Sequence, residues 1–209
     1  MTSVQSQKRH EMTSGSDRRV VAGSYSRRFR RVSVIIVCWF LFNGSPKILS
    51  LNGGSAEYPL KLLFLYNFAK FVEWPSDSFR SPGAPLSICV VGHDPFSVDI
   101  ESELRTRPTG DHRVEFLALK PTDTLNVCQI VFIPITEKDQ AARIVKSLKG
   151  SRALTVGESE GFAVSGGIIN FTIEGGNVRF EINKLAADRA GLKISAKLLN
   201  LAKIVTDQD

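Results

Sequence analysis

The most constraining feature of the sequence is a pair of alternating segments that meet at a Gly-Gly turn. The turn reads Glu174-Gly175-Gly176-Asn177. Apolar side chains occupy every second position on both sides of it: Ile169, Phe171 and Ile173 before, and Val178, Phe180 and Ile182 after. Alternation with a period of two around such a turn predicts a β-hairpin with one buried face.

After the hairpin the apolar pattern changes its period. From Leu192 onward, apolar residues recur at helical spacing opposite a polar stripe that contains three lysines; the apolar positions are Ile194, Leu198, Leu201 and Val205. This pattern predicts an amphipathic C-terminal helix over 192–205 that closes over the apolar face of the hairpin. None of these residues suggests a chemical reaction.

The first 56 residues predict export. The basic segment Arg27–Arg31 is followed at once by an uncharged apolar run, Val32–Phe42, which is the layout of a secretory signal peptide. The run is about half of the ~20 residues that a membrane-spanning helix needs, which favours a cleaved signal over an anchor. A small, polar region follows, and Ala56 before Glu57 is one cleavage point. We therefore expect residues 1–56 to be signal peptide and cleavage region, and 57–209 to be a single exported domain.

The charge balance changes when this leader is set aside. Residues 1–56 hold nine Lys or Arg and two Asp or Glu, whereas residues 57–209 hold 18 and 19. The basic isoelectric point of the whole chain, about 9.4, is thus a property of the leader. The remaining domain has no excess of basic residues and gives no argument for nucleic-acid binding.

Residues 57–209 read as alternating helices and strands. The segment Pro59–Trp74 is apolar on most sides and is followed by Pro75, so it predicts a helix that is buried in the core or meets another protein. Apolar runs predict strands at 86–91, 114–119, 127–133 and 153–156, and helices are expected at 96–105 and 137–148. This order predicts an α/β fold with a mostly parallel sheet flanked by helices, and the hairpin added at one edge.

The best enzymatic candidate is His93-Asp94, because ligand sites in open α/β sheets lie at the carboxyl ends of strands. No second histidine has metal-ligand spacing, and Asp94 is explained as the N-cap of the helix that follows, with Pro95 at its first position. An enzyme or small-ligand binder built around His93 is the alternative reading.

The glycine-rich stretches lack the marks of a nucleotide site. Gly157–Gly161 and Ser165–Gly167 match neither a phosphate-binding loop nor a dinucleotide fingerprint. We expect Glu158 and Glu160 to lie on a solvated loop. The sequence therefore predicts no catalytic, cofactor-binding or metal-binding residues, and a protein that is not an enzyme.

Cysteine usage fits an exported protein. Cys38 lies in the leader, so Cys89 and Cys128 are the two cysteines of residues 57–209. Disulfides persist outside the cytoplasm, and both a Cys89–Cys128 bridge and two buried free thiols in adjacent strands fit the pattern.

Several segments resemble the YfiR family of exported bacterial proteins. They are YNFAKFVEWP (66–75), VGHDPF (91–96), VCQIVFIP (127–134), LTVGESEGFAVSGGIINF (154–171), VRFEIN (178–183) and AGLKISAKLLNLAKIV (190–205). The resemblance covers nearly all of 57–209, and the block from Leu154 onward is its most specific part. By this resemblance, Cys89 and Cys128 match a family disulfide, whereas a second pair found in some members has no counterpart in 163–170.

The resemblance implies a periplasmic regulator. The best-understood members bind the periplasmic sensor domain of an inner-membrane diguanylate cyclase and hold it inactive, which lowers cyclic di-GMP and biofilm formation. A peptidoglycan-associated outer-membrane lipoprotein can sequester the regulator, and the family suggests a homodimer. Such a repressor needs no catalytic group, only a higher affinity for one state of its target. We expect its partner face around Phe162, Glu181, Lys193 and Lys197.

Overall fold

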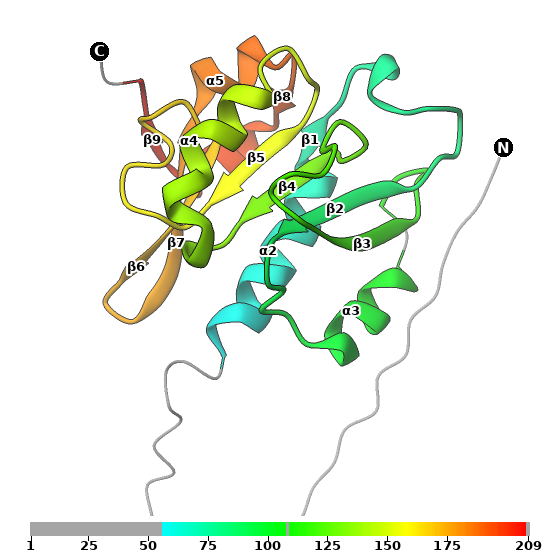
Figure 1. Ribbon diagram of the computed structural model, residues 1–209, viewed down its shortest axis with the longest axis horizontal. Coiled ribbons are helices and arrows are strands. Elements are labelled where there is room, and N and C mark those ends of the chain that lie inside the picture. Colours follow the sequence, from blue (N-terminus) through cyan, green and yellow to red (C-terminus); the bar gives the residue numbers. More distant parts are fainter. Residues whose placement is uncertain (1–55, 108, 208–209) are drawn as a thin grey trace, which may run out of the picture. The chain divides into compact units, whose positions relative to one another are not determined.

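The computed structural model describes residues 56–107 and 109–207, so the predicted signal peptide lies outside the described residues. Its centre is a seven-stranded sheet of order β3-β2-β4-β5-β6-β7-β9 (Figure 1). Strands β2 to β6 are parallel, β7 is antiparallel to β6, and β9 is parallel to β7. The strands are β2 (Leu86–Val91), β3 (Val114–Leu119), β4 (Ile130–Ile133), β5 (Leu154–Gly157), β6 (Ile169–Glu174), β7 (Asn177–Asn183) and β9 (Lys203–Val205). The predicted α/β class with a mostly parallel sheet is confirmed.

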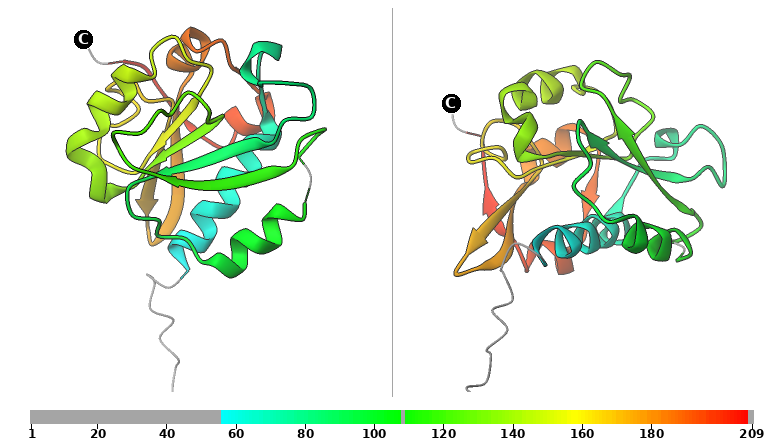
Figure 2. Two further views of the ribbon diagram at one scale, coloured as in Figure 1. Left: turned by 45° about the vertical axis from the view of Figure 1, so that its right-hand side comes forward. Right: turned by 60° about the horizontal axis from the view of Figure 1, so that its bottom comes forward.

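Helices cover both faces of this sheet (Figure 2). Helices α2 (Glu57–Phe71) and α3 (Val98–Arg105) lie on one face, and α4 (Lys138–Ser147) lies on the other. All residues of β2 and β4 are buried, as expected of parallel strands that are covered on both sides. Successive side chains of β2 alternate between two apolar clusters: Ile88 and Val90 belong to the α2 side, and Cys89 and Val91 to the α4 side.

The hairpin forms as the sequence predicts. Strands β6 and β7 pair from Ile169 opposite Ile182 to Glu174 opposite Asn177. The two central turn residues, Gly175 and Gly176, both have positive φ angles, 57° and 77°. A turn of this kind matches the twist of its flanking strands, which is why two glycines are favoured there.

Aromatic contacts hold α2 against the hairpin. The ring of Phe68 lies 5.7 Å from that of Phe171 and 5.3 Å from that of Phe180, measured between centroids. Phe64, on the next turn of the helix, contacts the same two rings. The helix is therefore largely a core element, although Leu60 and Leu63 remain 40% exposed.

The predicted C-terminal helix over 192–205 is wrong. After the short helix α5 (Lys184–Arg189), the chain forms β8 (Lys193–Ile194), a single turn α6 (Ala196–Leu199) and β9. β8 pairs with β1 (Val72–Glu73) in a separate two-stranded sheet, and β9 continues the large sheet beside β7. Of the predicted apolar stripe only Leu198 is buried, because backbone pairing with β1 and β7 outweighs the helical spacing.

The start of α3 also differs from its prediction. The helix begins at Val98, and Ser97 rather than Asp94 is its N-cap. The Asp94 carboxylate instead accepts a hydrogen bond from the backbone N–H of Phe96, at 2.8 Å, and stabilises the turn that precedes the helix. Asp94 is therefore a turn residue, because aspartate bonds the backbone two positions ahead as readily as it caps a helix.

A disulfide joins Cys89 of β2 to Cys128, just before β4, with a Cα–Cα distance of 5.9 Å. Both cysteines lie in the apolar cluster under α4, at 0% and 3% exposure. The bridge closes a loop with a sequence separation of 39 residues that contains α3 and β3.

We predict that the double substitution Cys89→Ala and Cys128→Ala lowers the free energy of unfolding by about 4 kcal/mol, because it releases a loop of roughly 40 residues in the unfolded chain. Urea unfolding of the variant and of the oxidised parent measures the difference. The parent under reducing conditions is the matched control and should lose a similar amount. Equal midpoints for all three samples would contradict a stabilising role of the bridge.

Candidate functional site

His93 lies at the position where other open α/β sheets bind their ligands. The order β3-β2-β4-β5-β6 reverses direction between β2 and β4, and ligands in open α/β sheets bind beyond the carboxyl ends of strands at such a point. His93 follows β2 at this point and is exposed. Its imidazole has no hydrogen-bond or ion-pair partner in the described part of the chain.

The space between these strand ends is filled by a side chain of the protein itself. Gly92 has φ +82°, and a Cβ at this position would lie 2.4 Å from a carboxylate oxygen of Glu137. Glu137 also accepts a hydrogen bond from Gln140, which fixes it at the start of α4. Beside the loop, burial and then the charge of Asp94 raise the pKa of Glu101, while the guanidinium of Arg105 acts in the opposite direction. These groups stabilise the loop that follows β2, and none of them contacts the imidazole of His93.

A buried ion pair lies further along the same edge of the sheet. Lys61 of α2 contacts Glu158, which follows β5, and the two side chains are 4% and 3% exposed. Glu158 also accepts hydrogen bonds from the Tyr58 hydroxyl at 3.1 Å and from the backbone N–H of Ile135 at 2.7 Å. Its carboxylate therefore links α2 to the ends of β4 and β5. The expectation that Glu158 lies on a solvated loop is wrong, because α2 covers it.

The surroundings of this pair define a small cavity of about 330 Å³ between α2 and β6. It is lined by charged, polar, aromatic and apolar residues, among them Glu57, Tyr58, Glu160, Asn170 and Ile173. Burial, followed by the charge of Glu158 and its hydrogen bond, raises the pKa of Tyr58 to about 12. Tyr58 therefore stays a neutral donor throughout the physiological range.

Phe162 is not an exposed partner residue, which corrects the expectation from the sequence. It is 5% exposed and belongs to the apolar cluster beneath α4. A Cβ on Gly157 or on Gly167 would lie within 2.4 Å of its ring. The glycines of this stretch therefore make room for an aromatic side chain, which is why the segment is glycine-rich without being a phosphate-binding loop.

The other three expected partner residues are more accessible. Lys193 of β8 and Lys197 of α6 are exposed, while Glu181 of β7 is half-buried and pairs with Lys203 of β9 at 2.8 Å. Two apolar side chains of the same C-terminal segment are also exposed, Leu201 by 70% and Ile204 by 51%. Because β9 is the last strand of the sheet, this region combines lysines, aliphatic side chains and a strand edge.

Among residues 56–107 and 109–207, no group of three or more His, Cys, Asp or Glu side chains is placed to hold a metal ion. None of the helices in this part of the chain is long and apolar enough to cross a membrane.

The fold and these sites define an α/β domain of the doubly wound kind, whose strand ends are occupied by its own side chains. The chain belongs to the YfiR/HmsC-like family, whose sequence profile matches residues 58–203. The resemblance expected from the sequence is confirmed. The family consists in general of periplasmic regulators of cyclic di-GMP signalling and has no established enzymatic activity.

Two solved structures are similar over part of the chain. One is a conserved domain protein from Vibrio cholerae O1 biovar eltor, with 16% identity, a TM-score of 0.42, and coverage of 56% of this chain and 54% of its own. The other is an ABC domain in complex with L-Trp from Streptococcus pneumonia, with 15% identity, a TM-score of 0.40, and coverage of 57% and 55%. The chain spans about half the length of each, and neither likeness bears on function.

We predict that Lys61→Met lowers the free energy of unfolding by about 3–5 kcal/mol, because it leaves Glu158 as an unpaired charge in a buried position. Adding Glu158→Gln should restore part of the loss, since the amide still accepts hydrogen bonds but carries no charge. Urea unfolding measures both effects.

The control for this prediction is Lys184→Met, which removes one partner of an exposed pair with Asp188. It should change stability by no more than about 0.5 kcal/mol. A Lys61→Met protein as stable as this control would show that the buried pair contributes nothing.

Proposed function

We propose that this protein is exported to the periplasm, where it binds the periplasmic sensor domain of an inner-membrane diguanylate cyclase and represses it. The observation that carries the proposal is membership of the YfiR/HmsC-like family over residues 58–203. The layout of residues 27–42, a basic cluster before a short apolar run, supports export. The outcome would be less cyclic di-GMP and less biofilm.

The chemistry of the described residues is compatible with a binding role. Repression requires that the protein bind the inactive state of the cyclase more tightly than the active state, and that difference in affinity is the whole mechanism. Polar groups at the strand ends link separate segments of the domain: Glu158 joins three segments and Glu137 packs on Gly92. A rigid scaffold of this kind presents its surface to a partner with little loss of conformational entropy.

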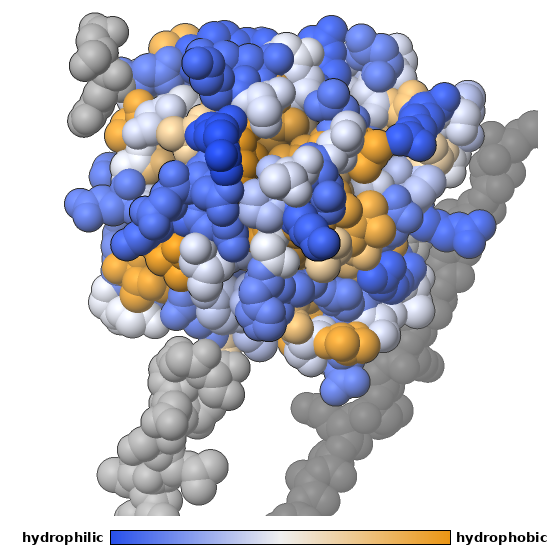
Figure 3. Space-filling view, viewed as in Figure 1, coloured by the Kyte–Doolittle hydropathy of each residue, from blue (hydrophilic) through white to orange (hydrophobic). Residues whose placement is uncertain are grey.

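The partner face that we propose lies on the C-terminal region and comprises Lys193, Lys197, Leu201 and Ile204, with Glu181 at its border. Interfaces typically combine an apolar centre with a polar rim, and this region supplies exposed residues of both kinds. The face that α4 covers is mostly hydrophilic, with apolar side chains visible in its hollowed centre (Figure 3). That surface is less suited to a stable interface.

Two further associations belong to the proposal. A peptidoglycan-associated outer-membrane lipoprotein would compete for the regulator, and two copies of this chain would form a homodimer. The exposed Leu60 and Leu63 on α2 support the second association only weakly, because most of that helix is already buried within one copy.

We predict that reversing two charges, with Lys193→Glu and Lys197→Glu, relieves repression and raises cellular cyclic di-GMP several-fold, because both lysines are exposed on the proposed face. Both side chains are solvated, so stability should change by no more than about 0.5 kcal/mol each. A fluorescent cyclic di-GMP reporter measures the output in cells.

The matched control reverses two exposed lysines elsewhere, Lys120→Glu and Lys138→Glu, with the same change in net charge. This control should repress normally. If both double variants repress equally well, the two lysines do not belong to the partner face.

The competing function, a ligand site or enzyme around His93, makes a different prediction. His93→Ala should leave cyclic di-GMP output unchanged, because the side chain is exposed and has no partner in the described part of the chain. The same reporter measures the output, and a periplasmic pull-down measures retention of the cyclase. Loss of repression by a stable His93→Ala protein would favour the alternative.

A further inference from the structure

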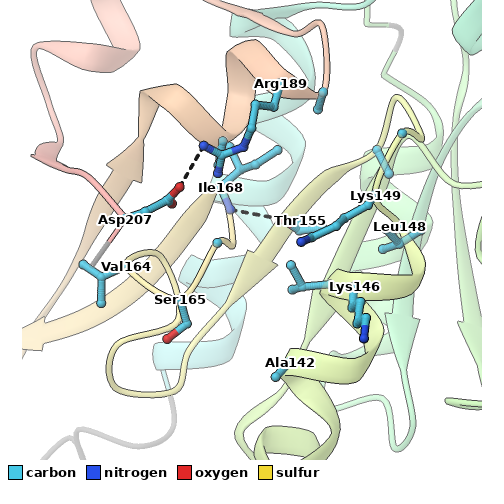
Figure 4. Close-up of a pocket in the computed structure, with 16 residues that line it drawn as sticks. Ala142, Lys146, Leu148, Lys149, Thr155, Val164, Ser165, Ile168, Arg189 and Asp207 are labelled. Atoms are coloured by element: carbon cyan, nitrogen blue, oxygen red, sulfur yellow. Dashed lines mark hydrogen bonds and ion pairs between the residues drawn. The ribbon is translucent and has the colours of Figure 1, made fainter. Parts of the chain in front are cut away.

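A second, larger cleft lies on the α4 face of the sheet, and it shares no lining residue with the cavity beside Lys61 and Glu158 (Figure 4). Its volume is about 810 Å³, and its floor includes Thr155 of β5 and Ala153, the residue before that strand. The C-terminal half of α4 and the turn after it form one wall, and α5 and the C-terminal tail form the other.

The cleft is positively charged. Lys146, Lys149 and Arg189 line it against a single acidic side chain, Asp207, which leaves an excess of two positive charges. Figure 4 shows Lys149 extending over β5 toward the side of the cleft that carries Arg189 and Asp207. The charge of Lys149 reaches that carboxylate: hydrogen bonds from Arg189 and Asn183 lower the pKa of Asp207, and the charges of Arg189 and Lys149 add to the effect.

The carboxylate of Asp207 is held by a defined set of donors. One of its oxygens is 2.7 Å from the guanidinium of Arg189, and the other accepts a hydrogen bond from the side-chain amide of Asn183. Asn183 is fully buried and its orientation is fixed, because its amide also donates to the carbonyl of Ala163 at 2.8 Å and its oxygen caps α5 through Ala186.

The two donors keep their positions when the carboxylate of Asp207 leaves. Asn183 keeps its bonds to Ala163 and Ala186 when Asp207 is absent, and Arg189 is 55% exposed, so water can take the place of its partner. Asp207 lies two residues beyond the end of β9 and is itself exposed. Thr155 on the floor offers a further donor: its oxygen accepts from the N–H of Ile168, and its hydroxyl hydrogen has no acceptor in the described residues.

We propose that this cleft is a binding site for a carboxylate ligand. When no ligand is bound, the carboxylate of Asp207 occupies the position that the ligand carboxylate would take. The incoming carboxylate takes the donors of Arg189 and Asn183, while Lys146, Lys149 and Thr155 contact the rest of an anionic molecule. The ligand is a free polycarboxylate or an acidic peptide segment, which share the same recognition chemistry. This inference does not depend on the proposed repressor function.

The test measures binding of two probes to the processed, exported chain by calorimetry at low ionic strength, where charge contacts are least screened. The probes are citrate, a free polycarboxylate, and the N-acetylated peptide Thr-Asp-Gln-Asp, which has the sequence of residues 206–209. The variants are Asp207→Ala, which removes the carboxylate that contacts Arg189 and Asn183, and Asp207→Ala with Arg189→Gln, which also removes the guanidinium. Asp99→Ala, an exposed aspartate on α3, is the control for the loss of one negative charge.

At least one probe should bind Asp207→Ala about fivefold more tightly than the parent. In the parent the probe must displace Asp207 from Arg189, and an exposed ion pair of this kind lowers the probe's affinity by about fivefold at most. Adding Arg189→Gln should weaken that binding by about tenfold or more, and Asp99→Ala should behave like the parent. Binding of citrate alone identifies a small polycarboxylate as the ligand class, and binding of the peptide alone identifies an acidic segment. The proposal is overturned if neither probe binds Asp207→Ala at millimolar concentration, or if Arg189→Gln leaves the affinity unchanged.

Discussion

The buried charge of Lys61 is the constraint on which the packing of α2 against the ends of β4 and β5 depends. A lysine on the buried side of an apolar helix is tolerated only when its charge is paired and its hydrogen bonds are satisfied. Glu158 meets that need, and the same carboxylate binds Tyr58 and the backbone after β4. The loop after β5 must therefore fold back under α2. The ion pair of Lys61 and Glu158 thus joins the first turns of α2 to the ends of β4 and β5, beside the small cavity.

Short-range patterns predicted much of the fold. The hairpin was predicted because alternation and two glycines with positive φ are local properties of the chain, and the strand Leu86–Val91 because an uninterrupted apolar run suits a parallel strand covered on both faces. The C-terminal segment was mispredicted because its partners are distant in sequence. β8 pairs with Val72 and Glu73, and β9 pairs with β7, and these non-local bonds cannot be read from the spacing of Leu198, Leu201 and Val205.

The candidate sites were harder to predict for the same reason. Phe162 is expected on the partner face because it flanks the hairpin in the sequence, but its ring packs into the space left by Gly157 and Gly167. The buried pair did leave a signal: Lys61 is one of the few polar residues in a largely apolar helix, which should prompt a search for an acidic partner. Nothing local pointed to Glu158 as that partner, since it lies 97 residues away. Asp207 gave no signal, because an acidic residue near a chain end is ordinarily solvated.

The C-terminal segment connects the surface proposed for a partner with the cleft proposed for a carboxylate. β9 presents Ile204 and Lys203, and two residues beyond its end Asp207 contacts Arg189 and Asn183. A partner that pairs with the edge of β9 would restrict the position of Asp207, and a ligand that displaces Asp207 would loosen the end of β9. Because both events act on the same short segment, we expect their binding free energies to be coupled, and linkage then requires that each change the affinity of the other by the same factor. A carboxylate that weakens partner binding would therefore itself bind more weakly to the complex than to the free regulator.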